Sequence, residues 1–246
     1  MICFADKHTR PAVRRMWKTC FNDSEAFMDL YFSEKYKDEN TLIYIEDNQA
    51  VASLQILPYL FTFYGENIPV SYISGACTLP EFRKRGIMGK LLIASFEVMK
   101  QRDIPLSILI PSNENLYKYY KKFGYEKVFE KDDAEIPLKE IWEKSNGDLD
   151  LAYQTFNQIF KNKDFCIQKT KSDFLTIIKD AKSDNFPPKT NLSGMARVID
   201  AEYLIALYEK HTHTPHHCGL DPQSTDRTIC RLLFEQQQPV LNLMLE

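Results

Sequence analysis

The stretch SYISGACTLPEFRKRGIMGKLLIASF spans residues 71–96 and changes its pattern halfway along. Its first part predicts a β-strand that ends before Pro80, because proline cannot donate a hydrogen bond to a sheet ladder. From Gly86 onward the apolar residues recur at helical spacing and predict a helix. The stretch therefore joins a strand to a helix through a short basic loop.

Such a junction suits phosphate groups. The first N–H groups of a helix have no partner within the helix and carry partial positive charge. Gly86 and Gly89 permit close backbone approach and unusual dihedral angles. A pyrophosphate ligand fits this chemistry, whereas the spacings of the nucleotide-hydrolysing loop and of the dinucleotide-binding loop are both absent. Fixed positive charge at the same point comes from Arg83, Lys84, Arg85 and Lys90.

Strand and helix patterns alternate on both sides of this junction, up to about residue 130. Turns are predicted at Asp47-Asn48 and at residues 65–69. The alternation predicts an α/β (α+β) fold. The predicted strands are residues 1–5, 41–46, 50–64, 70–79, 106–110 and 125–131, and the predicted helices are 8–21, 24–36, 86–101 and 113–124, with Ser24 as a helix cap.

The composition changes after residue 130. Residues 131–140 are acidic and contain a proline, which predicts a linker. We therefore expect two domains, residues 1–130 and a smaller α+β domain of residues 131–246. In the second domain the predicted helices are 149–160, 171–181, 201–211 and 224–236, and the predicted strands are 195–200 and 239–245.

The bulk composition narrows the classes of protein. Hydrophobic residues make up 44% and the formal net charge is −3, which indicates a globular protein and gives no support to a nucleic-acid partner. No apolar run reaches membrane-spanning length, and the start shows no signal-peptide core. No two cysteines form a CxxC pair, so we expect reduced thiols and a cytoplasmic location. The six cysteines are Cys3, Cys20, Cys77, Cys166, Cys218 and Cys230.

The loop RKRGIMG resembles the pyrophosphate loop of the GNAT acetyltransferase superfamily, written Q/R-x-x-G-x-G/A. Arg83 and Gly86 match this pattern, while Met88 replaces its last small residue and Gly89 comes one place late. A second element, SILIPSNENLYKYYKKFGYEKV, is similar to another part of these enzymes, in which a helix carries a tyrosine four residues before a glycine. Here the tyrosine is Tyr120 and the glycine is Gly124.

The resemblance implies a central mixed sheet flanked by helices and an N-acetyltransferase that uses acetyl-CoA as cosubstrate. Backbone groups of Ala76, Cys77 and Thr78 would meet the pantetheine arm and polarise the thioester carbonyl. Asn115 would be a further contact, although a plain helix N-cap is an equal alternative. The resemblance places the pyrophosphate on Arg83, Lys84, Arg85, Gly86, Ile87, Met88, Gly89 and Lys90.

Tyr120 is the expected general acid, because a phenol can protonate a departing thiolate of similar basicity. The alternative is that Tyr117, Tyr119 and Tyr120 only pack around a helix. The general base stays open. The loop RKRGIMGKLL, residues 83–92, resembles that of the enhanced-intracellular-survival subfamily, in which the carboxyl terminus reaches the active site. Glu246 is therefore one candidate, and an ordinary exposed terminus is the other interpretation. Further base candidates are Glu25, Asp29 and Glu114.

That subfamily is also the one that the second half resembles, through residues 194–207 and 228–246. The resemblance implies an abbreviated sterol-carrier-like C-terminal region. The acceptor would be a primary amine of a small molecule or peptide. A non-catalytic acyl-CoA-binding or regulatory module is the alternative function, and the sequence does not address the oligomeric state.

Two other features suggest chemistry outside this scheme. The segment HTHTPHHCG contains four of the five histidines beside Cys218, all of them usable zinc ligands. Its spacing matches no structural zinc pattern, so we expect a polar loop and no metal site. Cys77 is expected to pack as a small apolar residue, because no histidine is tied to it as the base of a nucleophile.

Overall fold

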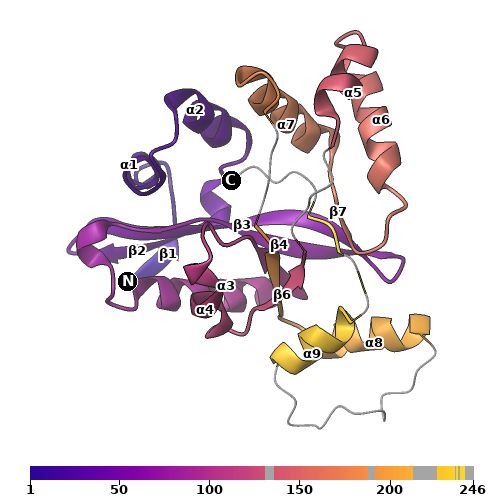
Figure 1. Cartoon of the computed structure of the whole chain (residues 1–246). Coiled ribbons are helices and arrows are strands. Elements are labelled where there is room, and N and C mark those ends of the chain that lie inside the picture. Colours follow the sequence, from indigo (N-terminus) through magenta and orange to yellow (C-terminus); the bar gives the residue numbers. More distant parts are fainter. Residues whose placement is uncertain (131–135, 188–191, 213–225, 236, 238, 242–246) are drawn as a thin grey trace. The chain divides into compact units, whose positions relative to one another are not determined.

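A computed structural model of the chain describes residues 1–130, 136–187, 192–212, 226–235, 237 and 239–241 (Figure 1). The chain forms two compact units whose segments interleave along the sequence. Among the described residues, unit 1 contains Met1–Pro58 and Ser71–Arg102, and unit 2 contains Tyr59–Val70 and the residues from Asp103 to Leu241. The long strands β3 (Gln49–Phe63) and β4 (Glu66–Thr78) contribute residues to both units.

Unit 1 otherwise consists of short strands and three α-helices. Its remaining elements are β1 (Ile2–Phe4), α1 (Arg10–Phe21), α2 (Glu25–Glu34), the 3-10 turn η1 (Asp38–Asn40), β2 (Thr41–Glu46), the 3-10 turn η2 (Pro80–Phe82) and α3 (Ile87–Gln101). Unit 2 contains β5 (Leu106–Leu109), α4 (Asn115–Lys121), β6 (Glu126–Phe129), α5 (Leu138–Lys144), α6 (Leu149–Phe160), β7 (Cys166–Gln168), α7 (Lys171–Ser183), β8 (Gly194–Val198), α8 (Ala201–Thr212) and α9 (Asp226–Leu233).

In unit 1 the strands are covered by helices on both faces. β1 pairs antiparallel with β2, β2 pairs antiparallel with β3, and β4 follows β3 in the sheet. Figure 1 shows α1 and α2 on one face of these strands and α3 on the other. The fold class predicted from the sequence is confirmed, since helices flank a central mixed sheet.

The helices of unit 1 form for reasons visible in the sequence. α1 buries Val13, Met16 and Trp17, which recur at the three- and four-residue spacing of one helix face. Ser24 caps α2, because its hydroxyl accepts a hydrogen bond from the N–H of Phe27. The cap predicted at Ser24 is therefore confirmed.

In unit 2, β8 lies between β5 and β6 and runs antiparallel to both. β7 pairs antiparallel with the far end of β3, where Phe61 lies opposite Ile167. An aromatic cluster fills the core beside these strands, and buried aromatic rings contribute much of the apolar area of a core. The cluster contains Phe61, Phe63, Phe129, Phe165 and Phe234.

Glu126 is a buried carboxylate in this unit, with 4% of its surface exposed. It forms ion pairs with Arg227 and Arg231, both from α9. Burial alone would raise the pKa of Glu126, but the hydrogen bonds from the two arginines outweigh it and hold the pKa below its usual value. The two ion pairs therefore attach α9 to β6, and α9 also contacts β8.

Arg197 of β8 links the end of α4 to the start of α9. Its Nη1 donates to the carbonyl of Phe123 at 2.6 Å, and its Nη2 donates to Asp226 at 2.7 Å. Gly124 stands beside it in the left-handed region, with φ +83°. A Cβ added to Gly124 would lie 1.8 Å from the guanidinium, so this position requires glycine both for its dihedral angle and for space.

Several other predictions are settled by the described residues. The turn at Asp47-Asn48 is confirmed, and both residues have positive φ, as a tight hairpin turn needs. The turn predicted at residues 65–69 is wrong, because β4 already begins at Glu66 and the turn lies at Tyr64-Gly65. The predicted linker is wrong at its end, where α5 begins at Leu138.

The second half differs from its prediction in two more places. β7 is not predicted from the sequence, because it is only three residues long. Of the strand predicted at 239–245, Val240 forms one parallel bridge with Cys166, and residues 242–246 lie outside the described part. The proposed domain boundary near residue 130 stays a prediction. In the described part of the chain, no helix combines the length and apolar character that a bilayer crossing needs.

Gly124→Ala should destabilise the protein more than Gly65→Ala. Both glycines have positive φ, +83° and +78°, so both changes cost about 1–2 kcal/mol in backbone strain. Only the first drives a methyl group into Arg197, since nothing lies within 4 Å of a Cβ at Gly65. We expect an extra loss of roughly 1 kcal/mol or more in urea unfolding, from the lost hydrogen bond. Equal losses in the two variants would contradict this account.

Glu126→Gln should lower the free energy of unfolding at neutral pH by about 1–3 kcal/mol, because two guanidinium groups lose their buried anion. A carboxylate with a lowered pKa in the folded state stabilises above its unfolded pKa, and this contribution disappears as the pH falls through the folded pKa. The difference between wild type and variant should therefore shrink as the pH falls below about 4. Denaturant unfolding at several pH values measures it. A constant difference would argue against the ion pairs.

Candidate functional site

The backbone turns sharply between the end of β4 and the start of α3. Lys84 and Gly86 both have positive φ, +62° and +73°. Gly86 is the N-cap of α3, and a Cβ there would meet nothing within 4 Å, so glycine serves the dihedral angle rather than the space. The first turn of α3 carries no acidic residue. Its N–H groups and dipole are therefore arranged as at an anion-binding helix terminus.

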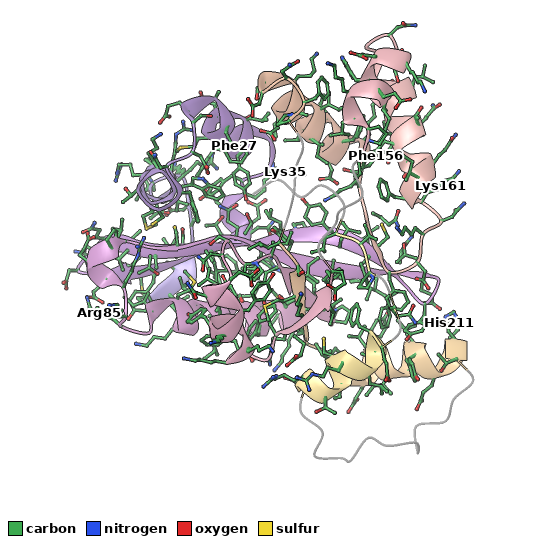
Figure 2. The ribbon with its side chains drawn as sticks, viewed as in Figure 1. Phe27, Lys35, Arg85, Phe156, Lys161 and His211 are labelled. Carbon is green, nitrogen blue, oxygen red and sulfur yellow. The ribbon has the colours of Figure 1, made fainter. Side chains whose placement is uncertain are left out.

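The basic side chains of the loop are exposed, and two are held by the protein. Arg83 donates from Nε to the carbonyl of Thr78 at 3.0 Å, which fixes it against the end of β4. Arg85, labelled in Figure 2, pairs with Glu46 of β2 at 2.6 Å. Lys90 lies over the ring of Tyr44, with its Nζ 5.7 Å from the ring centroid. Glu46 therefore offsets part of the positive charge of the loop.

The end of β4 leads into this loop with an irregular strand. Gly75 has φ +56°, and a Cβ there would lie 2.3 Å from the Trp17 ring, so only glycine fits. A strand glycine in this conformation marks a bulge, which re-aims the residues that follow. Ala76 and Thr78 are partly exposed, whereas Cys77 between them is buried with 4% exposure. Backbone groups on both sides of Cys77 therefore come near the surface of unit 1.

The first turn of α3 anchors the loop to the core. Ile87 and Gly89 are buried, and Met88 between them is partly exposed. Gly89 belongs to the helix rather than to the loop, so its small size serves packing. The bulky Met88 does not disturb the turn, since the left-handed conformation falls on Gly86.

Asn115 is the first residue of α4 and is exposed. Its own N–H donates to the side-chain oxygen of Asn113 at 3.1 Å. The interpretation of Asn115 as the N-cap is therefore wrong, because Glu114 occupies the cap position and Asn113 supplies the hydrogen bond. The side chain of Asn115 therefore does not serve as the cap of α4.

Tyr120 lies near the end of α4 and is 7% exposed. Its ring contacts Tyr119 and Tyr125, with centroids 5.4 and 5.8 Å apart. The hydroxyl groups of Tyr125 and Ser107 are hydrogen-bonded at 2.7 Å, and burial raises the pKa of Tyr125 above its usual value. Tyr117 donates to the carbonyl of Ser193 at 2.6 Å. Tyr117 and Tyr125 are therefore structural, and the role of Tyr120 stays a prediction.

The acidic candidates divide by position. Glu25 and Asp29 both accept hydrogen bonds from Arg14 at 2.8 Å on the surface of α1 and α2. Glu246 lies outside the described residues, as does most of the histidine segment. His211, which is described, lies 3.3 Å from Glu66. Within the described ranges, no three His, Cys, Asp or Glu side chains gather as metal ligands.

Two groups of polar contacts near the end of β4 were not predicted from the sequence. The sulfur of Cys20, in the last turn of α1, lies 3.5 Å from the carbonyl oxygen of Thr78 and 3.7 Å from Nη2 of Arg83. Tyr31 of α2 donates to Gln55 at 2.8 Å and lies 3.0 Å from the Ser74 hydroxyl. Both depend on α1 and α2 packing on β4, and no local pattern reveals such a long-range contact.

The fold agrees with what comparison with known proteins shows. The sequence model of the acetyltransferase (GNAT) domain matches residues 4–128. This domain defines a class of acyltransferases. The match covers half of the chain and contains the loop, so the chain belongs to the GNAT acetyltransferase family. No curated protein matches the sequence as a relative.

Solved structures share the fold over more of the chain. The GCN5-related N-acetyltransferase from Kribbella flavida has a TM-score of 0.57 and 14% identity, covering 84% of this chain and 74% of its own. The GCN5-related N-acetyltransferase from Anabaena variabilis has a TM-score of 0.54 and 15% identity, covering 81% of this chain and 73% of its own. A probable N-acyltransferase from Enterococcus faecalis has a TM-score of 0.51 and 14% identity, covering 81% of this chain and 73% of its own. These likenesses show the fold and extend it beyond residue 128.

The ion pair between Glu46 and Arg85 neutralises part of the positive charge of the loop, so a substitution at either residue should change its affinity for anions. Glu46→Gln should strengthen binding of inorganic pyrophosphate about two- to fivefold, because Arg85 loses its competing anion. Arg85→Gln should weaken it. Glu97→Gln is the control, since it makes the same charge change in an exposed pair further along α3. Calorimetry at low salt measures the affinities. A gain of equal size in the control would indicate only net charge.

Proposed function

We propose that this protein transfers an acetyl group from acetyl-CoA directly to a primary amine of a small molecule or peptide. The observation that carries the proposal is the junction of β4 and α3, where Gly86 opens a helix terminus among four basic side chains. Membership of the GNAT acetyltransferase family supports the acyltransferase part. Acetyl-CoA as donor and an amine as acceptor are the proposed refinements.

In this proposal the loop binds the pyrophosphate of coenzyme A. The N–H groups that open α3 and the exposed Arg83, Lys84, Arg85 and Lys90 supply the donors and the charge. The partly exposed backbone beside Cys77 binds the pantetheine arm and polarises the thioester carbonyl. Asn115 is a further cofactor contact, since its side chain is exposed and does not cap α4.

Tyr120 is the proposed general acid. The amine nitrogen attacks the thioester carbonyl carbon, the carbon–sulfur bond breaks, and the phenol of Tyr120 protonates the departing thiolate. A base or water takes the proton that the amine loses, and Glu246 is the proposed candidate. The surface pairs of Glu25 and Asp29 with Arg14 make these two acids weaker candidates, because each already binds a guanidinium.

We also propose that the chain is related to the enhanced-intracellular-survival subfamily, with an abbreviated sterol-carrier-like C-terminal region. This part rests on the sequence of residues 194–207 and 228–246. The strand β8 followed by α8 is the described element that corresponds to the first of these segments. The subfamily includes enzymes that acetylate aminoglycosides, so such amines belong in a substrate panel.

The proposal is tested by thiol release from acetyl-CoA with a panel of aminoglycosides, polyamines and peptide amines, beside calorimetry with coenzyme A. Tyr120→Phe should lower turnover about 100-fold and leave the affinity for coenzyme A nearly unchanged, because a general acid acts in the transition state. Tyr119→Phe is the matched control and should keep its turnover. Arg83→Gln should weaken coenzyme A binding about tenfold.

The outcomes separate the alternatives. Turnover with any amine establishes the enzyme and names its acceptor class. Binding without turnover across the panel favours the acyl-CoA-binding or regulatory module over the enzyme. Absence of both binding and turnover would show that the loop from Arg83 to Lys90 does not hold coenzyme A, and the proposed function would fail.

A further inference from the structure

Two cysteines that are far apart in the sequence meet beside the loop. Cys20 lies in the last turn of α1, and its sulfur is 3.5 Å from the carbonyl oxygen of Thr78, the residue that follows Cys77 in β4. The side chains of Cys20 and Cys77 interact, and each shifts the pKa of the other. Both are free cysteines, one partly exposed and one buried. Ser53 of β3 holds the inner thiol, with its hydroxyl 3.3 Å from the Cys77 sulfur. Cys20 is therefore the more accessible of the two cysteines, and Cys77 is the buried one.

The surroundings make the two sulfurs chemically unequal. The hydrogen bond from Cys77 lowers the pKa of Cys20, partial burial opposes this, and the Arg83 guanidinium lowers it further, to about 6. The same hydrogen bond and complete burial hold the pKa of Cys77 well above its usual value. Cys20 is therefore the more easily ionised of the two thiols.

We propose that Cys20 and Cys77 form a dithiol oxidation site, in which Cys20 reacts with a peroxide and Cys77 closes the disulfide. The site does not depend on the proposed function. A partly exposed, acidic thiol that lies 3.7 Å from an arginine and has a second thiol beside it is the arrangement of a reactive and a resolving cysteine. Cys3, Cys166 and Cys230 serve as internal references among the described cysteines.

The chemistry balances with hydrogen peroxide as the oxidant. The Cys20 thiolate attacks one peroxide oxygen, the O–O bond breaks, and with one proton the products are Cys20 sulfenic acid and water. The Cys77 thiol then displaces hydroxide from the sulfenic sulfur, forming the S–S bond and a second water. The two sulfurs lose two electrons in total, and the peroxide gains them.

Closing the disulfide requires Cys20 to move. A disulfide has an S–S length near 2.05 Å, so the two sulfurs must approach each other. Cys20 lies two residues before Asn22, the left-handed cap that ends α1. A helix terminus has few backbone hydrogen bonds to lose, so the Cys20 sulfur can make this movement. Oxidation also removes the acidic thiol beside Arg83, which ties the charge of the loop to the oxidation state of the pair.

The experiment is cysteine mapping of the native protein after treatment with equimolar hydrogen peroxide, alkylation of the remaining thiols and digestion with trypsin. We expect a linked product of peptides 19–35 and 38–83 that dithiothreitol separates. Before oxidation, Cys20 should be alkylated at pH 7 about tenfold faster than Cys3. Failure of either result, with Cys20 unmodified or linked elsewhere, overturns the proposal.

Two variants keep the test independent of folding. In Cys77→Ser the hydrogen bond to Cys20 can persist but no disulfide can form, so Cys20 should accumulate as a sulfenic acid that dimedone traps. Cys3→Ser is the matched control and should give the same linked peptides as the wild type. Coenzyme A calorimetry on the reduced protein tests the proposed function separately, so a failure there leaves the mapping result standing.

Discussion

The turn from β4 into α3 is the constraint around which unit 1 is organised. Two backbone positions, Lys84 and Gly86, adopt positive φ within three residues, and the buried Ile87 follows at once. A chain can hold this shape only if both flanking elements are anchored. Trp17 over Gly75 anchors the strand side, and the packed first turn of α3 anchors the helix side. The basic side chains are thereby presented from a rigid base.

Much of unit 1 could be predicted because its elements have signals in the local sequence. The strand, the loop and α3 each have a local signal, namely an apolar run, a glycine between basic residues and an apolar period of 3.6. The tight turn at Asp47-Asn48 and the cap at Ser24 are local as well. The residues of the candidate loop come from one continuous segment, so their proximity needs no knowledge of tertiary structure.

What could not be predicted depends on contacts between distant segments. β7 has three residues and exists because the end of β3 supplies its partner. α5 follows a proline in a stretch whose charge suggests a linker, yet Leu138 and Ile141 find a buried surface. Cys20 reaches Arg83 and Cys77 only after α1 packs on the sheet. The pattern of a single segment cannot report which distant surface will cover it.

The order of strands in unit 2 also affects how the protein is made. β8, the strand between β5 and β6, is encoded well after both of its neighbours. During synthesis the ribosome releases β5 and β6 first, and their unpaired edges must wait for Gly194–Val198 to emerge. The segment that matches the GNAT domain model, residues 4–128, therefore does not contain β8, the strand that pairs with β5 and β6. A shortened chain that stops there would expose the edge of β5 and leave β6 without its strand partner, so nascent chains of that length would need protection from aggregation.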